Sequence, residues 1–207
     1  IRRRTDKGVP TYDEGDVFLL GDEELVPIAD GFFVRRVEGA FARIRRVAAK
    51  HEDFWAVTDR TGTRRLYGRI RADREGPDGR TGAWLLSESR DPNDNRVTYT
   101  WERDPIGNRS YLSQVDWGAG TYRARFTYSS RPDVLRNARA GYVETTDRRL
   151  SMIELDVKRS SDGAYTPFDR FTLGYTESPI TGLSLLSSVE RTGISSTGAT
   201  RAWPLLT

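Results

Sequence analysis

Apolar and polar residues alternate along short segments of this chain, and turn-forming residues separate the segments. The clearest example joins two aromatic and β-branched runs, Phe54 to Thr58 and Arg64 to Tyr67, across Asp59 to Gly62. Gly62 can supply the positive φ that a tight turn between twisted strands requires. We therefore predict a β-hairpin over residues 54–67 and regard it as the unit that the rest of the chain repeats.

A second predicted hairpin follows a polar loop at residues 72–82. Its strands, 83–89 and 96–101, are joined by Asp91-Pro92-Asn93-Asp94-Asn95, residue types that hydrogen-bond their own backbone in turns. The later strand alternates strictly, so one side would be apolar and the other wet. The apolar side of that strand holds Val97, Tyr99 and Trp101.

Similar hairpins continue to the end of the chain, with Gly118 to Gly120 as one turn and a polar loop around Arg131-Pro132-Asp133. Several of the strands end in an aromatic residue, as at Tyr128 and Tyr175. We predict an all-β fold, an extended antiparallel meander of consecutive hairpins that forms a curved sheet. Its remaining strands would be residues 111–117, 122–128, 150–159, 170–175 and 183–191.

Two regions depart from this pattern. Glycine and proline interrupt short apolar runs in residues 1–31, which predicts an irregular lead-in segment from a preceding domain. Residues 32–207 would form the β-rich region. The chain starts at Ile1 without a methionine, so we expect it to be a fragment of a longer protein.

The second exception is the segment 40–48. Its apolar residues recur at helical spacing, so periodicity alone favours a short helix. The residues that would share the helical face are Ala40, Phe41, Ile44, Val47 and Ala48.

Composition agrees with a thin sheet that has one wet face. Hydrophobic residues make up 36% of the chain and aromatic residues 11%, and the mean hydropathy is −0.65. Only three of the 33 basic residues are lysines, and 30 acidic residues are interspersed with them. A nucleic-acid-binding protein would gather its positive charge. We expect no nucleic-acid partner, and cross-strand pairs of arginine with carboxylates instead.

The sequence also limits the chemistry available. Cysteine is absent, so disulfides and thiolate metal sites are excluded. No apolar run reaches the roughly 20 residues of a membrane helix, and no segment resembles a signal peptide. We expect no membrane insertion by this segment.

We predict no catalytic, cofactor-binding or metal-binding residue. His51, beside Glu52 and Asp53, is the only histidine, and no nucleophile and orienting acid can be placed around it from spacing. The Asp91-to-Asn95 turn has oxygen atoms at alternate positions, as a calcium loop has. It lacks the glycine and the distant bidentate glutamate of the twelve-residue calcium hand, so plain turn chemistry is favoured.

Four aromatic residues leave a second interpretation open. They could stack on sugar rings in a carbohydrate-binding module, or they could line a sheet face that packs within the structure, which we favour. These residues are Trp84, Trp101, Trp117 and Tyr122.

The order of the segments resembles one protein family. Arg36 to Ile44, Trp55 to Asp59, and Gly62 to Gly68 resemble the SpvB-like N-terminal region that insecticidal toxin complex (Tc) B components share with a related virulence-plasmid protein. Other parts are similar to the family's lead-in and to its Rhs/YD-type hairpins. These parts are Gly8 to Tyr12, Leu19 to Gly21, Trp84 to Leu86, Asp91 to Tyr99, Tyr111-Leu112, Arg148 to Leu150, Tyr175, and Ser184 to Val189 with Gly193.

The resemblance implies a function. In the family this region flanks a β-propeller and forms part of a hollow β-sheet shell, in which B and C components enclose a toxic effector. The chain would then be a non-catalytic shell segment of a secreted toxin subunit. Its partners would be neighbouring domains of the same chain, other toxin-complex subunits and the effector polypeptide.

The resemblance also bears on two local interpretations. It implies that residues 40–48 are a strand, against their helical periodicity. Some SpvB-like proteins carry an ADP-ribosyltransferase in a separate domain marked by two glutamates one residue apart. Glu88 has no such partner, because position 90 is Arg90. The alternative function is a secreted or surface carbohydrate-binding or protein-binding β-module. In either case we predict that free sheet edges lead to self-association.

Overall fold

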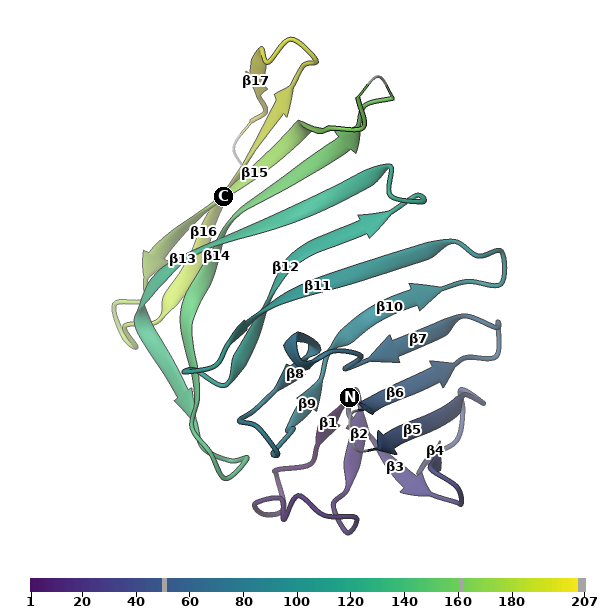
Figure 1. The fold of residues 1–207 in the computed structure, drawn as a ribbon. Coiled ribbons are helices and arrows are strands. Elements are labelled where there is room, and N and C mark those ends of the chain that lie inside the picture. The colour runs from purple at the N-terminus through teal and green to yellow at the C-terminus, as the bar shows by residue number, and fades with distance from the viewer. Residues whose placement is uncertain (50–51, 161, 205–207) are drawn as a thin grey trace. The chain divides into compact units, whose positions relative to one another are not determined.

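The computed structural model describes residues 1–49, 52–160 and 162–204, and strands dominate it (Figure 1). The described strand pairs are antiparallel and belong to one sheet, which confirms the predicted all-β antiparallel meander. The chain divides into two compact units. Unit 1 comprises residues 1–111 and 136–145, and unit 2 comprises residues 112–135 and 146–207.

The strands before β11 have two to seven residues, β11 to β16 have nine to sixteen, and β17 has three. The first eleven strands are β1 (Arg2–Arg3), β2 (Phe18–Leu20), β3 (Glu23–Pro27), β4 (Phe32–Arg35), β5 (Arg43–Ala49), β6 (Glu52–Thr58), β7 (Arg64–Tyr67), β8 (Arg74–Glu75), β9 (Ala83–Trp84), β10 (Leu86–Arg90) and β11 (Arg96–Asp104), with a 3-10 turn η1 (Arg71–Asp73) before β8. The others are β12 (Arg109–Trp117), β13 (Tyr122–Asn137), β14 (Glu144–Lys158), β15 (Tyr165–Glu177), β16 (Ser184–Ile194) and β17 (Thr200–Ala202).

The hairpin predicted at residues 54–67 is present as β6 and β7, which pair from Trp55 opposite Tyr67 to Thr58 opposite Arg64. Its turn is held by the Asp59 carboxylate, which accepts hydrogen bonds from the backbone N–H groups of residues 61 and 63. Gly62 has a φ of 85°, as the turn requires. The second hairpin is also confirmed, because β10 pairs with β11 across residues 91–95.

The helix favoured by the periodicity of residues 40–48 is wrong, because residues 43–49 form β5. Ile44 is buried between exposed neighbours, as in a strand. The next inward position is Arg46, whose guanidinium carbon lies 4.9 Å from the Phe18 ring centroid and 5.1 Å from that of Trp84. An arginine stacked on aromatic rings thus occupies a core-facing position, and it hid the strand's alternation.

Residues 1–31 contribute three strands to unit 1. β1 pairs with both β2 and β9, and Phe18 of β2 and Leu25 of β3 are buried. The domain boundary expected between residues 31 and 32 remains a prediction.

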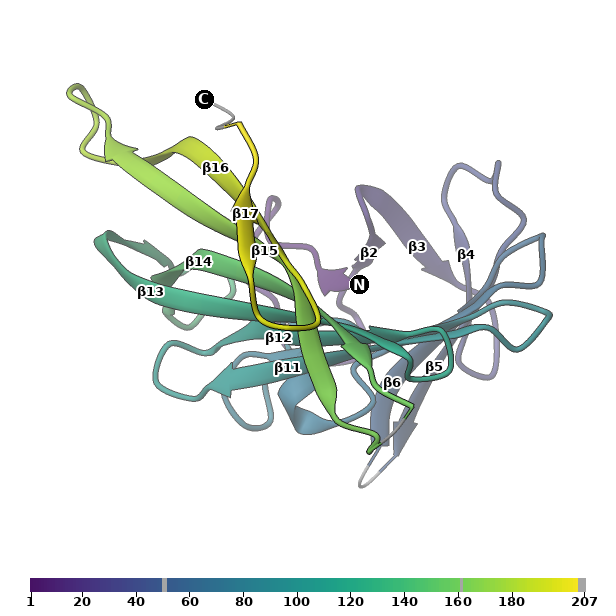
Figure 2. The same cartoon turned by 90° about the horizontal axis from the view of Figure 1, so that it is seen from above.

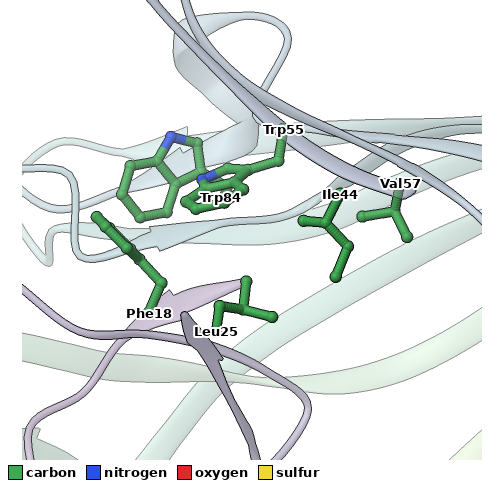
Figure 3. Close-up of a cluster of buried hydrophobic side chains, with 6 residues drawn as sticks. All are labelled: Phe18, Leu25, Ile44, Trp55, Val57 and Trp84. Atoms are coloured by element: carbon green, nitrogen blue, oxygen red, sulfur yellow. The ribbon is translucent and has the colours of Figure 1, made fainter. Parts of the chain in front are cut away.

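The hydrophobic core of unit 1 gathers side chains from five strands (Figure 3). Its aromatic rings meet edge to face, with centroids 4.9 Å apart for Phe18 and Trp55 and 5.9 Å for Trp55 and Trp84. Each such pair adds about 1 kcal/mol beyond the burial of apolar area. The buried residues of the cluster are Phe18, Leu25, Ile44, Trp55, Val57 and Trp84.

Unit 2 consists of long paired strands, and Figure 2 shows β14, β15 and β16 from above. The predicted hairpins of residues 111–128 and 150–175 are confirmed. The last predicted strand, residues 183–191, is present as β16, which extends to Ile194, and the sequence pattern did not predict β17. The polar loop expected at residues 131–133 is wrong, because these residues lie within β13.

The polar residues in 131–133 are Arg131 and Asp133, and Asp133 makes hydrogen bonds within and between strands. The Asp133 carboxylate accepts hydrogen bonds from Arg131, at 2.7 and 3.1 Å, and from the backbone N–H and hydroxyl of Ser184, at 2.7 and 2.6 Å. These bonds hold the pKa of Asp133 well below its ordinary value. Its polar character therefore serves contacts with another strand, not a turn.

Charged residues pair across the strands of unit 2, as predicted. Arg125 of β13 donates two hydrogen bonds to Asp156 of β14, at 2.6 and 3.0 Å, and Asp156 is only 1% exposed. Arg170 of β15 donates two more to Glu154, at 2.7 and 3.0 Å. We call this set, together with Asp116 and Arg123 at 2.7 Å, the ion-pair ladder. Arg125 and Arg170 each use two donors of the planar guanidinium, a geometry that lysine cannot provide.

Candidate functional site

The structure places the residues singled out from the sequence in different surroundings. His51 lies outside the described residues. Within residues 1–49, 52–160 and 162–204, no three His, Cys, Asp or Glu side chains come together in a way that could hold a metal ion. That described part of the chain also has no helix with the length and hydrophobicity of a membrane span.

The Asp91-to-Asn95 segment is a self-contained turn. The Asp91 carboxylate accepts hydrogen bonds from the backbone N–H groups of Asn93 and Asn95, both at 2.9 Å, and from the Asn95 amide at 2.8 Å. The Asn95 amide and the two backbone groups hold the pKa of Asp91 below its ordinary value. The Asp91 carboxylate is therefore engaged in turn chemistry, and the Asp94 carboxylate contacts Arg90.

The four aromatic residues weighed as a sugar-binding set do not form one site. Trp84 is 1% exposed, and its indole N–H donates to the carbonyl oxygen of Asp53 at 3.1 Å. The Trp101 indole donates to the carbonyl oxygen of Leu86 at 2.8 Å. Only Trp117 and Tyr122 remain as a surface pair. Their rings stack with centroids 5.7 Å apart, and Tyr122 is 41% exposed.

Glu88 lies between two arginines. Its side chain is 14% exposed and lies 3.7 Å from Arg69 and 3.9 Å from Arg96. It therefore serves as a shared counter-charge for two arginines.

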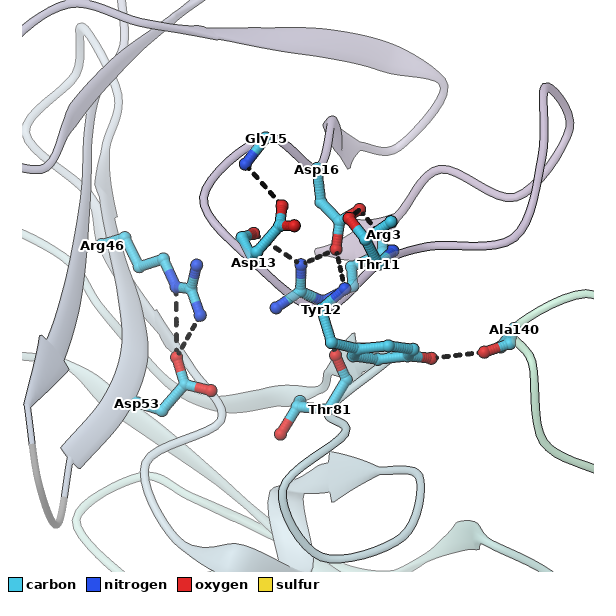
Figure 4. Close-up of polar contacts among 10 residues, drawn as sticks. All are labelled: Arg3, Thr11, Tyr12, Asp13, Gly15, Asp16, Arg46, Asp53, Thr81 and Ala140. Carbon is cyan, nitrogen blue, oxygen red and sulfur yellow. Dashed lines mark hydrogen bonds and ion pairs between the residues drawn. The ribbon is translucent and has the colours of Figure 1, made fainter.

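Sequence reasoning missed a polar cluster in unit 1 that surrounds a buried arginine (Figure 4). Arg3 is 6% exposed, and it contacts the Asp16 carboxylate and donates to the carbonyl oxygen of Thr81 at 2.9 Å. Burial alone would raise the pKa of Asp16, but the backbone N–H groups of Thr11 and Tyr12 and the Arg3 charge together hold that pKa below its ordinary value. Asp16 therefore fixes the loop over Arg3.

Tyr12 closes this cluster in a strained conformation. Its φ is 65°, a region that bulky residues rarely occupy. Its ring centroid lies 4.9 Å from the Arg3 guanidinium carbon, and its hydroxyl donates to the carbonyl oxygen of Ala140 at 2.6 Å. The strain is thus offset by contacts that tie the loop to the segment 136–145 of the same unit.

A cavity of about 460 Å³ adjoins the cluster. Three arginines in its wall have carboxylate partners: Arg3 contacts Asp16, Arg46 donates to Asp53 at 3.0 and 3.2 Å, and Arg71 donates to Asp78 at 3.0 Å. The charges are close to balanced, so the cluster can stabilise the fold but offers little to attract an ion. Within the pairs, the partners are 7 to 13 positions apart, but Arg3 bonds Thr81 78 positions away, so no single local motif marks the cluster.

The segment predicted as a polar loop also contains a buried glutamate. Glu75 of β8 is buried, and burial raises its pKa although Arg109 lies 3.3 Å away. Its carboxylate accepts a hydrogen bond from the backbone N–H of Ser110 at 3.2 Å. Because Arg109 also lies 3.8 Å from Glu144, one cation serves two acids.

Comparison with known proteins identifies the architecture. Residues 31–119 match the sequence model of the family described as Salmonella virulence plasmid 65kDa B protein, SpvB. No curated protein sequence matches the chain.

Solved structures match the whole chain at the level of fold. The complex TcdB2-TccC3-Cdc42 matches 99% of this chain with a TM-score of 0.85 and 22% identity. The Photorhabdus luminescens Tc holotoxin pore matches 99% with a TM-score of 0.85 and 23% identity. In both cases the chain spans only 13% of the matched chain.

A smaller structure matches at nearly full length. The N-terminal domain of the effector protein SpvB from Salmonella typhimurium strain LT2 matches 94% of this chain, which spans 86% of it, with a TM-score of 0.82 and 21% identity. The fold, the sequence model and the segments compared above agree with one another. The chain therefore contains an SpvB-type region and has the fold shared by the SpvB N-terminal domain and the Tc toxin B/C structures.

Proposed function

We propose that this chain is a non-catalytic wall segment of a Tc/Rhs-type bacterial toxin subunit, and that its sheet forms part of a shell around a toxic effector polypeptide. The observation that carries the proposal is the match of 99% of the chain to structures of TcdB2-TccC3 complexes. On this proposal the parent protein is secreted, and its partners are neighbouring domains, other toxin subunits and the effector.

The chemistry of the chain is consistent with containment. A continuous antiparallel sheet satisfies its backbone hydrogen bonds and leaves few free edges for other chains to join. The ion-pair ladder of unit 2 crosses β12 to β15 and ties neighbouring strands together at their side chains. Such a wall would separate an unfolded passenger from solvent and proteases without any catalytic group.

The first test is the sequence of the parent gene on both sides of residues 1 and 207. The proposal expects a β-propeller and many more YD-type hairpins, followed by a variable tail. A wall-anchoring segment without such repeats would contradict it.

The second test uses the intact parent toxin assembled with its partner component. Replacing Arg125 with alanine leaves the buried Asp156 unpaired, so the wall should open and the enclosed polypeptide should become sensitive to added protease. Arg159→Ala, which removes an exposed ion pair with Asp162, is the matched control. Equal protease resistance of both variants would count against a wall role for this region.

A carbohydrate-binding module is the second candidate, and the stacked Trp117 and Tyr122 favour it. Trp84 is unsuitable for testing this idea because it is buried in the core. A glycan array with wild-type protein and the Trp117→Ala variant is decisive. A sugar signal that the variant loses would support the module, and the absence of any signal in the wild type would reject it.

A further inference from the structure

One face of the unit 1 sheet gathers arginines that are scattered in the sequence. Strand alternation directs Ile44, Trp55 and Val57 into the core and leaves the intervening positions of β5 and β6 on the opposite face. The same face continues across β7, β10 and β11, which are neighbours in Figure 1. We call it the basic face. Its arginines are Arg43, Arg45, Arg64, Arg69, Arg90 and Arg96.

Three of these arginines stand directly opposite one another. Arg64 of β7 is in register with Arg90 of β10, and Arg90 is in register with Arg96 of β11. Like charges opposite each other on adjacent strands are unfavourable. The register therefore places three like charges side by side on adjacent strands.

Few carboxylates compensate this charge. Glu88 is shared by Arg69 and Arg96 at 3.7 and 3.9 Å, and Arg90 contacts Asp94. Glu52 lines the same 410 Å³ cavity as four of the arginines. Within the described residues, Arg43, Arg45 and Arg64 form no ion pair with a carboxylate. The basic face thus differs from the ion-pair ladder, where each arginine has its own acid.

Apolar side chains separate the arginines. Arg43 and Arg45 lie over the Phe32 ring, with guanidinium carbons 5.0 and 5.4 Å from its centroid. The groove beside them has a volume of about 290 Å³ and is also lined by Val47 and Phe54. Arginine and aromatic residues are enriched in protein–protein interfaces and lysine is depleted. No lysine lines either groove.

We propose that the basic face is a docking surface for an acidic, extended segment of another polypeptide. Carboxylates of that segment would neutralise the opposed Arg64, Arg90 and Arg96, and its apolar side chains would enter the groove beside Phe32 and Phe54. A polypeptide fits both features, because every second side chain of a strand faces the same way. The proposal rests on the charge arrangement of unit 1 and does not depend on a shell role for the chain.

The test measures binding of a fluorescein-labelled peptide of about 12 residues in which Glu and Val alternate. Fluorescence polarisation is recorded with the full chain at about 50 and 150 mM NaCl, because ion pairing weakens with salt. The Arg64→Glu, Arg96→Glu double variant should weaken binding about tenfold or more. The control double variant, Arg159→Glu with Arg201→Glu, changes the net charge equally but lies in unit 2 and should bind as the wild type does.

Three outcomes of the binding experiment would overturn the proposal. Equal losses in both double variants would mean that only net charge matters. A Glu–Gly peptide that binds as tightly as the Glu–Val peptide would show that the groove does not bind apolar side chains. A single-stranded DNA of equal charge that binds more tightly than the peptide at the higher salt would assign the face to nucleic acid.

A folding readout keeps the test interpretable. Because the opposed arginines repel one another, Arg90→Thr should raise the midpoint of thermal unfolding or leave it unchanged. A lowered midpoint would show that Arg90 serves the fold, and it would contradict the proposal.

Discussion

The Cα of Gly68 lies against the side chain of Trp84, so that a Cβ at residue 68 would come within 3.0 Å of both Cβ and Cγ of Trp84. Gly68 also has a φ of 74°, which residues with a side chain rarely adopt. The two residues fix how the end of β7 approaches the core.

We predict that Gly68→Ala destabilises the protein by about 2–4 kcal/mol, because it combines backbone strain with displacement of a buried tryptophan. Urea denaturation measures the change. Gly79→Ala is the matched control, since Gly79 has a φ of 81° but has open space around it. It should cost only about 1 kcal/mol. Equal costs would show that the contact with Trp84 contributes nothing.

We predict that Asp59 makes stability depend on pH in acid. Hydrogen bonds from the Thr61 hydroxyl and from Arg65 lower its pKa from 3.8 to about 2. A folded-state pKa below the unfolded value contributes stability above pH 4, and this contribution is lost as the pH falls toward 2. Denaturation at a series of pH values should show the loss, and Asp59→Asn should remove it. An NMR titration that places the Asp59 pKa near 4 would refute the assignment.

We predict that Arg125→Ala destabilises the protein by about 3 kcal/mol, because it leaves the buried Asp156 without its partner. Replacing both residues, as in Arg125→Met with Asp156→Leu, should restore most of the loss. Thermal and urea denaturation of the three variants provide the comparison. A double variant as unstable as the single one would mean that the pair does more than neutralise a buried charge.

We predict that Tyr175→Phe lowers stability by about 1 kcal/mol through the loss of one hydrogen bond. The Tyr175 hydroxyl donates to the carbonyl oxygen of Leu150 at 2.6 Å, and Tyr165 makes a similar bond to Gly120 at 2.6 Å. Tyr122→Phe is the control, because the hydroxyl of Tyr122 contacts no acceptor among the described residues. If the two variants have the same free energy of unfolding, the cross-strand hydrogen bond of the Tyr175 hydroxyl makes no net contribution to stability.

The hairpins could be predicted from the sequence because their signals are local. The turn at Asp59 and the turn at Asp91 each contain the acceptor that holds them, and the flanking alternation specifies which side is buried. Tyr128 and Tyr175, expected at strand ends, lie within the longer strands β13 and β15, where their hydroxyls donate to carbonyl oxygens of other strands.

Other features depended on contacts that the sequence does not reveal. Arg46 occupies a core-facing strand position because its guanidinium lies over three aromatic rings, whereas the spacing of the apolar residues in 40–48 favoured a helix. Asp133 lies in a strand because Ser184, 51 residues later, uses its carboxylate. The cluster of Arg3 and Asp16 is also non-local, and it could be found only in the structure.

The arrangement of charges on the basic face also depends on contacts between distant residues. Acidic residues are interspersed with the basic ones in the sequence, which argued against a gathered basic surface. Strand register then separates them, because it places Arg64, Arg90 and Arg96 side by side. Predicting such a surface would require the register of three strands in advance.

The ion-pair ladder has a further consequence for any polypeptide that moves past it. Asp156 and Glu154 are buried and already bound to Arg125 and Arg170, so the ladder leaves neither carboxylate free to bind another cation. A basic side chain of another polypeptide would therefore gain no unpaired carboxylate from Asp156 or Glu154. On the shell function proposed above, an effector polypeptide beside the ladder would find both of these carboxylates buried and already paired.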